Sequence, residues 1–599
     1  MAENVSDFII HRLYEWGVRR IYGYPGDGIN GLIGALQRFD NKIEFIQVRH
    51  EEQAAFMACA HAKFTGEVGV CMATSGPGAI HLLNGLYDAK KDHMPVVAIV
   101  GHAATTAIGG DYQQEVDLPS LFKDVASSYE AVVSSPVAAR HVVDRALRIA
   151  MGMRSVTTII VPKDIQEKKA VSNPPHKHNT LHSGVGYCRP RVIPQGRDLQ
   201  KAAEILNAGE RVAMLVGAGA MNAEEEIVAV ADKLQAGIAK ALLGKAVVPD
   251  DHPFVTGTIG LLGTEASSEM MSNCDTLLMI GTSFPYAEFL PKEGKARGVQ
   301  IDIDPRMLGI RYPMEINLTG DAADTLHELL PLLEQKEDRS WRERLTATRR
   351  KSEAVGARRA EIEGHPINPE VIFTELSPRL PDRCIVTGDA GTSTNWLARH
   401  LHMRKGMKFS LSGGLATMGG GVPYAIAAKF AFPDRVAICL TGDGAMQMNG
   451  LNELITVAKY WKKWSDPRIV FFVSNNRDLN QVTWEMRIET GDPKYLVSQQ
   501  LPDFPYASYG ESLGFMGIAV DRADQVGDAW ERALSADRPV VLEAHTDPAI
   551  SLLPPHISFQ QAKELATALS KGDPEEVPVI VEQAKALAAG LFPKLGEHK

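Results

Sequence analysis

The stretches RVAICLTGDG (435–444) and IVFFVSNN (469–476) decide the fold of this chain. Each is a short apolar run that ends in glycine and aspartate or in asparagine, and a helical pattern over roughly 447–462 separates them. Apolar runs without polar alternation that are joined by helices are typical of parallel strands covered on both faces. The pattern therefore predicts a strand–helix–strand unit of a doubly wound α/β domain.

The same alternation of apolar runs and helical patterns recurs along most of the chain, for example in VGVCMAT (68–74), VAMLVG (212–217) and CIVTGD (384–389). Two stretches, 166–195 and 336–369, interrupt it and are interpreted as connections, the second with a solvated helix. We therefore predict three doubly wound parallel-sheet domains, followed by a helical tail. Their expected bounds are 1–165, 190–335 and 365–548, with the tail at 549–599.

Composition agrees with a globular protein that has several cores. The 599 residues are too many for a single core, and 45% are hydrophobic and 23% charged. The net charge of −10 is spread along the chain and does not favour nucleic acid as a partner. The N-terminal stretch has the pattern of an amphipathic helix with acids, which is not that of a signal peptide. No apolar run has the length of a membrane span, and six cysteines without a CxxC pair favour a reduced, intracellular protein.

Asp443 and Asn476 lie at the ends of the two apolar runs at 435–444 and 469–476. In a right-handed strand–helix–strand unit both strands run the same way, so both residues emerge at the carboxyl edge, where such sheets bind ligands. A carboxylate and an amide oxygen suit Mg²⁺, while Gly442 and Gly444 leave room for a phosphate at a helix N-terminus. A GDG triplet alone is a common turn. Together with the NN-ended strand it favours a diphosphate–Mg²⁺ clamp.

This combination resembles the signature of thiamine-diphosphate enzymes. The resemblance implies that Mg²⁺ is held by Asp443, by Asn476 and by a backbone oxygen of Asp478. The interval between the motifs is longer than usual, and KKWSDP (462–467) is interpreted as an inserted surface loop. The implied contacts of the coenzyme on this domain are Ala416, Thr417, Met418, Gly442, Asp443, Gly444, Ala445, Met446, Asn476, Asp478, Leu479, Asn480, Gln481 and Val482.

Two further segments resemble elements of the same family. In IQVRHEEQ (46–53), Glu51 matches the glutamate that activates the coenzyme through its aminopyrimidine ring, and it should be buried enough to share a proton. The alternative is that Glu51 and Glu52 only favour a helix N-terminus through the macrodipole. In SGGLATMGGG (412–421), Met418 matches the residue beneath the coenzyme, although an apolar methionine is also ordinary core packing.

The middle block does not carry a complete dinucleotide motif. VGAGAM (216–221) lacks the third glycine, and the acid expected about twenty residues later is missing, so NAD is not expected. The block resembles the flavin-binding domain of pyruvate oxidases instead, although relatives exist that keep this domain without flavin, and a buried strand with its turn is an alternative. The residues implied to contact FAD are Gly260, Leu261, Leu262, Gly263, Ser283, Phe284, Pro285, Tyr286, Asp302 and Asp304.

Within the family, the chain resembles the quinone-linked pyruvate dehydrogenases, often called pyruvate oxidases. Asp27 in YPGDGIN (24–30) and His102 match that type, whereas a satisfied loop histidine is the alternative for His102. Gln481 departs from the pattern, because the oxidases carry phenylalanine there. The catalytic set that the resemblance implies is Glu51, His102, Gln114 and Glu485.

The C-terminal region, LPPHISFQQAKELATALSKGD (553–573), also resembles the quinone-linked enzymes. In these enzymes the tail covers the active site and engages the membrane surface. An apolar stripe of Ile557, Phe559, Leu565 and Leu569 is compatible with a helix that docks on its own protein or with one that binds lipid.

The resemblance as a whole implies a cytoplasmic enzyme, peripheral at the inner face of the cell membrane if its tail binds lipid. It would use thiamine diphosphate, Mg²⁺ and FAD to decarboxylate a 2-oxo acid, above all pyruvate. The enamine would be oxidised through FAD by a quinone or oxygen, giving acetate and CO₂. The active site of the family is shared between two chains, so the expected assembly is a homodimer at least and a homotetramer by analogy. A non-oxidative carboligase of the acetolactate synthase type is the chief alternative, and a binding protein without turnover is another.

Overall fold

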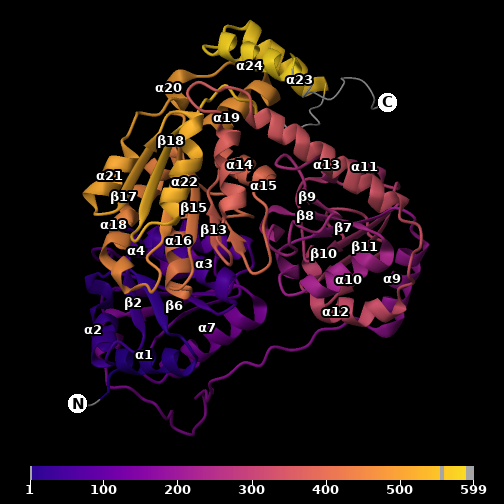
Figure 1. The fold of residues 1–599 in the computed structure, drawn as a ribbon. Helices are drawn as coiled ribbons and strands as arrows, with labels where there is room; N and C mark the ends of the chain where they lie inside the picture. The colour runs from indigo at the N-terminus through magenta and orange to yellow at the C-terminus, as the bar shows by residue number, and fades with distance from the viewer. Residues whose placement is uncertain (1–2, 553–558, 589–599) are drawn as a thin grey trace.

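The computed structural model describes residues 3–552 and 559–588, and its core consists of three six-stranded sheets, all parallel. Figure 1 shows the first sheet below the third on the left, and the second to their right. The predicted α/β class with three doubly wound sheets and a helical tail is confirmed. It follows from apolar strand runs that are buried on both faces and joined by helices.

The first sheet has the order β2-β1-β3-β4-β6-β5. Its strands are β1 (Arg20–Gly23), β2 (Glu44–Gln47), β3 (Gly69–Ala73), β4 (Val96–His102), β5 (Tyr129–Val132) and β6 (Val156–Pro162). The helices are α1 (Val5–Glu15), α2 (Asn30–Arg38), α3 (Glu51–Thr65), α4 (Pro77–His81), α5 (Leu83–Lys91), α6 (Leu118–Phe122), α7 (Ala139–Met153) and α8 (Lys163–Glu167).

The second sheet has the order β12-β11-β10-β7-β8-β9. Its strands are β7 (Val212–Val216), β8 (Gly237–Lys240), β9 (Val255–Thr258), β10 (Thr276–Ile280), β11 (Arg297–Asp302) and β12 (Ile316–Thr319). The helices are α9 (Gly196–Ala208), α10 (Glu224–Leu234), α11 (Glu265–Asn273) and α12 (Ala322–Leu329). An irregular segment from Lys168 to Gln195 leads into this domain, and the predicted solvated helix of the second connection is α13 (Ser340–Ala360).

The third sheet has the order β14-β13-β15-β16-β18-β17. Its strands are β13 (Ile385–Gly388), β14 (Lys408–Ser410), β15 (Ala437–Gly442), β16 (Ile469–Asn475), β17 (Met516–Val520) and β18 (Val540–His545). The helices are α14 (Pro369–Arg379), α15 (Thr392–His400), α16 (Gly421–Ala431), α17 (Asp443–Ala445), α18 (Leu451–Tyr460), α19 (Asn480–Glu485), α20 (Leu496–Gln499), α21 (Tyr506–Ser512) and α22 (Val526–Leu534). Two π-helical turns, Met446–Gly450 and Met486–Thr490, follow α17 and α19.

The first and third domains share one hydrophobic core. A single cluster of buried side chains includes Phe56 from α3, Tyr424 from α16 and Phe471 from β16. The Lys63 ammonium joins the two domains as well, because it donates to Asp92 of the first and to the Leu411 carbonyl of the third. The expected surface loop at 462–467 is only partly at the surface, since Trp464 is buried in this shared core.

The tail comprises α23 (Phe559–Ser570) and α24 (Glu576–Ala588), which lie at the top of the molecule in Figure 1. Of the predicted apolar stripe, Leu565 is buried and Leu569 is half-buried against the core of the third domain, so this part of the tail docks on its own protein. Ile557 and the side chain of Phe559 lie outside the described residues. Among the described helices, none combines the length and the apolar character that a membrane crossing requires.

A buried ion pair ties the second domain to the third, and it should be essential for stability. The Lys240 ammonium is fully buried and contacts Asp250, whose other carboxylate oxygen accepts a hydrogen bond from the Met403 amide of the third domain. Removal of one partner leaves the other charge buried without compensation. We expect Asp250→Ala to destabilise the protein by about 3 kcal/mol or more, measured by denaturant unfolding. The exposed neighbour Asp251 provides the control, and equal effects of Asp250→Ala and Asp251→Ala would contradict the assignment.

Candidate cofactor and metal site

The two strands of the quoted stretches lie side by side, and their ends are joined through one carboxylate. Strand β15 pairs with β16 so that Gly442 lies opposite Ser474, which places Asp443 beside the end of β16. The Asp443 Oδ2 atom accepts hydrogen bonds from the amides of Asn476 (3.0 Å) and Arg477 (2.6 Å). The structure thus brings together two residues that are 33 positions apart, as the sequence predicted.

The environment of Asp443 favours a bound cation. The residue is only 3% exposed, and burial raises the pKa of its carboxyl group to about 7, an effect to which the nearby Asp478 adds. The three backbone amides that donate to the carboxylate, those of Gly444, Arg477 and Asn476, act in the opposite direction. A desolvated carboxylate that keeps part of its negative charge is a strong ligand for a divalent ion.

The neighbouring groups complete an oxygen-rich site. The amide oxygen of Asn476 accepts from the Asp478 amide at 3.0 Å, which fixes the turn after β16. The Asp478 carboxylate is already bound by Thr483, Asn480 and Lys494, so the group that this residue can offer a metal is its main-chain oxygen. A carboxylate, an amide oxygen and a carbonyl oxygen are a donor set that fits Mg²⁺. A Cβ atom on Gly442 would meet only open space, which leaves room for a phosphate.

The segment with Ala416, Thr417 and Met418 lies against the turn that contains Asp443 and Gly444. Ala416 has a positive φ of 54°, and the Thr417 hydroxyl accepts a hydrogen bond from Asn84 at 3.1 Å. A Cβ atom on Gly444 would lie 3.2 Å from Met418 Cε and 2.7 Å from Leu479 Cδ2, so these side chains converge on the backbone of Gly444. Behind them, Ala445, Met446 and Asn480 are buried, whereas Val482 is exposed. Met418 therefore lies beside the segments that carry the expected ligands Asp443, Asn476 and Asp478, which together are called the metal loop.

Asp389 is a residue of this region that the sequence analysis did not single out. It follows β13, is buried, and accepts hydrogen bonds from the amides of Gly419 (2.9 Å) and Gly421 (2.8 Å), directly after Met418. Burial raises the pKa of its carboxyl group to about 7. The signal was present, because both β13 and β15 end in the triplet Thr-Gly-Asp. Asp389 holds the Met418 turn as Asp443 holds the end of β16.

Glu51 opens α3 in the first domain and is nearly buried, with 8% exposure. Its Oε2 atom lies 2.9 Å from Nδ1 of His81, and the rings of His81 and His50 stack at 4.4 Å. Within one chain, the neighbouring Glu52 contacts the third domain, where it accepts a hydrogen bond from the Asn449 side chain at 2.9 Å. The Glu51 carboxylate is therefore held by its own domain and is not bonded to the metal loop of its own chain.

The other expected catalytic residues lie in two domains. His102 and Gln114 belong to the first domain, and Glu485 belongs to the third. His102 ends β4 and is buried, which lowers its pKa, and within the described residues its Nδ1 atom has no hydrogen-bond partner. Gln114 is exposed with a positive φ of 62°, and its carbonyl oxygen lies 2.7 Å from the position of a Cβ atom on Gly76.

Glu485 ends α19, beside the metal loop of the third domain. It accepts a hydrogen bond at 2.9 Å from Gln481, and Gln481 accepts one at 2.6 Å from Asn395 of α15. Gln481, the residue that departs from the oxidase pattern, thus connects Asn395 and Glu485 by hydrogen bonds.

The segments expected to contact FAD all follow carboxyl ends of the second sheet. Gly260–Gly263 follow β9, Ser283–Tyr286 follow β10, and Asp302 ends β11, with Asp304 two residues further. The incomplete dinucleotide loop has no open space at its first glycine, because a Cβ atom on Gly217 would lie 2.5 Å from the Gly281 carbonyl oxygen. Beside the Gly260 turn, Arg399 donates to the Leu261 carbonyl, while its Nε and Nη1 atoms are buried and have no partner in the part of the chain that the structure describes.

Comparison with known proteins gives matches over all three domains. Residues 3–121 match the model described as "Thiamine pyrophosphate enzyme, N-terminal TPP binding domain". Residues 199–329 match the central domain of the same series, and residues 389–544 match its C-terminal TPP binding domain. YdaP of Bacillus subtilis, which is named for containing thiamine pyrophosphate, is 36% identical over 96% of this chain and 98% of its own.

Relatives named for two different reactions match about equally well. Acetolactate synthase isozyme 2 large subunit of Escherichia coli is 30% identical over 94% of this chain and 99% of its own. Pyruvate oxidase of Lactiplantibacillus plantarum is 29% identical over 90% and 87%.

The raised pKa of Asp443 predicts a pH-dependent metal affinity. Protons and Mg²⁺ compete for this carboxylate, so we expect the Mg²⁺ dissociation constant, measured by calorimetry with saturating thiamine diphosphate, to rise about tenfold per pH unit below about 7. Titration of the free coenzyme with Mg²⁺ corrects for its own protonation. In the metal-free protein, the pH dependence of stability that Asp443 causes has the opposite sign to that of an aspartate in an ion pair. Because the folded pKa is the higher one, this group lowers stability as the pH rises from about 4 to about 7. A flat affinity profile over this range would contradict the assignment of Asp443 as a ligand.

Proposed function

The chain belongs to the thiamine pyrophosphate enzyme family, and from this we propose that it converts pyruvate and water to acetate and CO₂ while two electrons pass through FAD to a quinone or oxygen. Decarboxylation-type chemistry on a 2-oxo acid is common ground for the relatives. The oxidative outcome and the choice of pyruvate are the proposed part. The clamp of Asp443 and Asn476 at the carboxyl edge of the third sheet carries the thiamine-dependent part of the proposal.

When bound, thiamine diphosphate supplies the electron sink that the loss of CO₂ from a 2-oxo acid requires. The protein's part is to hold and orient the coenzyme. Asp443, Asn476 and the Asp478 carbonyl would hold Mg²⁺, and the space at Gly442 admits the diphosphate. Met418, whose turn is fixed by Asp389, would support the coenzyme from below.

Glu51 would exchange a proton with the aminopyrimidine ring. Its near-complete burial at the start of α3 supports this role, because it keeps the carboxyl group away from bulk water. The contact with His81 would keep the carboxylate in place.

The catalytic set is proposed to form between two copies of the chain. In a single chain Glu52 contacts the third domain, while Glu51 is held by His81 of its own domain. A second copy could therefore supply the metal loop that Glu51 serves. This makes a homodimer the minimum assembly, and a homotetramer is the proposed form by analogy with the family.

FAD is proposed for the second domain on the basis of Arg399. Its two buried nitrogen atoms without partners lie beside the Gly260 turn, where a ligand with acceptor atoms would satisfy them. Burial also lowers the pKa of Arg399 to about 10, which shows how poorly the guanidinium is solvated.

A carboligase of the acetolactate synthase type is the rival, because such relatives match this chain as well as pyruvate oxidase does. Gln481 in place of phenylalanine keeps this rival open. His102, Gln114 and Glu485 are the residues proposed to meet the substrate in either reaction.

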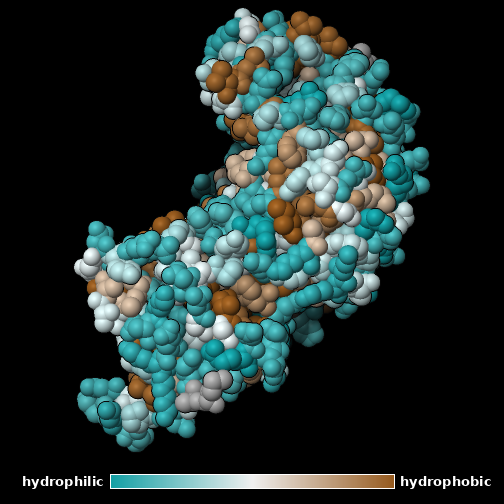
Figure 2. All heavy atoms as spheres, turned by 90° about the vertical axis from the view of Figure 1, so that its left-hand side faces the viewer, coloured by the Kyte–Doolittle hydropathy of each residue, from teal (hydrophilic) through white to brown (hydrophobic). Residues whose placement is uncertain are grey.

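The proposed setting is the cytoplasm, with the tail as the proposed point of contact with the inner face of the membrane. Helix α24 exposes an apolar face of Val577, Ile580 and Val581, and Figure 2 shows hydrophobic atoms at the top of the molecule, where the tail lies. A second protein surface would suit this face as well.

An anaerobic absorption spectrum separates the oxidase from the carboligase. We expect the purified protein to bind FAD, and pyruvate to bleach the visible flavin band in the absence of oxygen with release of acetate. Glu51→Gln should bind both cofactors yet leave the band unbleached, because the proton exchange is lost. Formation of acetolactate with an oxidised flavin would establish the rival reaction instead.

A mixing experiment tests the shared site. Glu51→Gln and Asp443→Ala subunits should each be inactive alone. After they are denatured together and refolded, half of the dimers are hybrids with one intact site, so about a quarter of the wild-type activity should return. If each chain uses its own Glu51 and Asp443, mixing restores nothing.

A further inference from the structure

The C-terminal tail is tied to the active-site region by a cluster of buried charges. The Arg487 guanidinium, in the π-helical turn after α19, binds both oxygen atoms of Asp573 at 2.8 and 2.9 Å and Glu575 at 2.9 Å. The side chains of Arg487 and Asp573 are completely buried. Asp573 and Glu575 belong to the turn that joins α23 to α24, so the tail supplies the carboxylates that neutralise this arginine.

Lys494 extends the cluster to the expected metal loop. Its ammonium lies 2.6 Å from Glu575 and 3.2 Å from Oδ1 of Asp478, and its backbone amide donates to Asp573 at 2.9 Å. The Lys494 side chain is 5% exposed and the Asp478 side chain 1%. One buried cation therefore connects the tail to the residue whose main-chain oxygen is expected to hold the metal.

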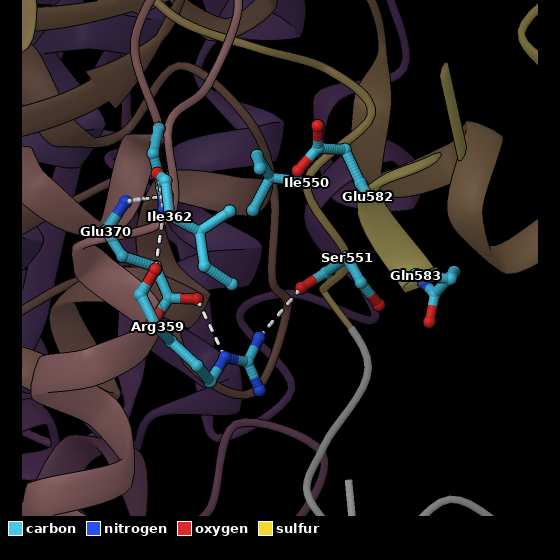
Figure 3. Close-up of a pocket in the computed structure, with 8 residues that line it drawn as sticks. Arg359, Ile362, Glu370, Ile550, Ser551, Glu582 and Gln583 are labelled. Atoms are coloured by element: carbon cyan, nitrogen blue, oxygen red, sulfur yellow. Dashed lines mark hydrogen bonds and ion pairs between the residues drawn. The ribbon is translucent and has the colours of Figure 1, made fainter. Parts of the chain in front are cut away.

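The rest of the tail is anchored independently of these charges. Leu565 of α23 and Val579 of α24 are buried in the same core cluster as Trp484 of α19. Further along, Figure 3 shows Glu582 and Gln583 of α24 at a small pocket whose opposite wall includes Arg359 and Glu370. Apolar packing thus keeps the tail docked, while the charged turn is the part that reaches toward Asp478.

Because buried charges are costly, a change in the tail acts on Asp478 through Lys494. Without Glu575, Lys494 keeps Asp478 as its carboxylate partner within the described part of the chain. The Lys494 ammonium is then no longer held on the side that faces the tail. Charges in a low-dielectric interior interact strongly, and removal of one partner displaces the others. A change in the tail must therefore shift the Asp478 carboxylate, and with it the peptide that offers the metal its oxygen.

We propose that the tail controls Mg²⁺ affinity, with Lys494 as the positioning residue that connects Glu575 to the Asp478 loop. The inference rests on the proposed function for the identity of the metal, and the contacts of the tail with Lys494 carry it. It gives the tail a role toward the metal site while the tail remains docked.

A double-mutant cycle on Mg²⁺ binding tests the proposal. Calorimetric titration of Mg²⁺ into the metal-free full chain with saturating thiamine diphosphate should show Glu575→Gln weakening binding about fivefold. Lys494→Met should also weaken binding, and in that background Glu575→Gln should have no further effect. Lys494→Arg, which keeps the charge, should retain most of the affinity. If the effects of Glu575→Gln and Lys494→Met simply multiply, the connection through Lys494 is wrong.

Lys571→Met is the matched control. Lys571 also joins the tail to the segment after α19, through Asp492 and the Gly491 carbonyl, but it does not contact Asp478. Its replacement should leave Mg²⁺ affinity unchanged. An unchanged affinity in Glu575→Gln as well would overturn the proposal.

Hydrogen exchange separates this inference from the proposed function. Glu575→Gln should increase exchange in residues 478–494 while α23 and α24 keep their protection. If the wild-type chain binds neither Mg²⁺ nor the coenzyme, the proposed function fails, and the exchange of 478–494 still decides whether the tail acts on this loop. If α23 and α24 lose protection together with 478–494, the tail has undocked as a whole, and the specific role of Lys494 is refuted.

Discussion

The bond between the Asp443 carboxylate and the amides that end β16 is the constraint on which the site depends. Parallel strands bring their carboxyl ends to one edge, but pairing alone leaves the loops free to diverge. Asp443 closes the gap by accepting hydrogen bonds from Asn476 and Arg477. Its burial makes the negative charge costly, so the arrangement that fixes the loop also creates the demand for a cation.

The same device appears twice in the third sheet. Asp389 after β13 fixes the turn behind Met418 through backbone amides, just as Asp443 fixes the end of β16. A cradle built on backbone donors depends on few side chains, so relatives with about 30% identity and different reactions can share it. Asn395, Gln481 and Glu485, linked by hydrogen bonds beside the metal loop, lie outside the cradle.

The sequence predicted the features that have local signatures. Buried strands, their ends and the convergence of Asp443 with Asn476 follow from apolar runs and from the handedness of strand–helix–strand units. Asp389 was missed although it shares the Thr-Gly-Asp triplet with Asp443, because no asparagine pair follows the next strand to mark it. Arg487 and Asp573 are 86 positions apart, and no periodicity announces an ion pair between residues so distant. The burial of Trp464 in an inserted loop likewise depends on tertiary packing alone.

The metal loop is held differently on its two sides. Asp443 follows a central strand of a sheet whose core is continuous with that of the first domain, so this side is anchored in packed structure. Asp478 lies on the segment that leads to α19, and its carboxylate depends on Lys494, which depends in turn on the tail. A cation placed between the two sides would bind most tightly when both are fixed. A tail that buries its charges against Arg487 and Lys494 provides the contacts on this second side that the sheet itself does not supply.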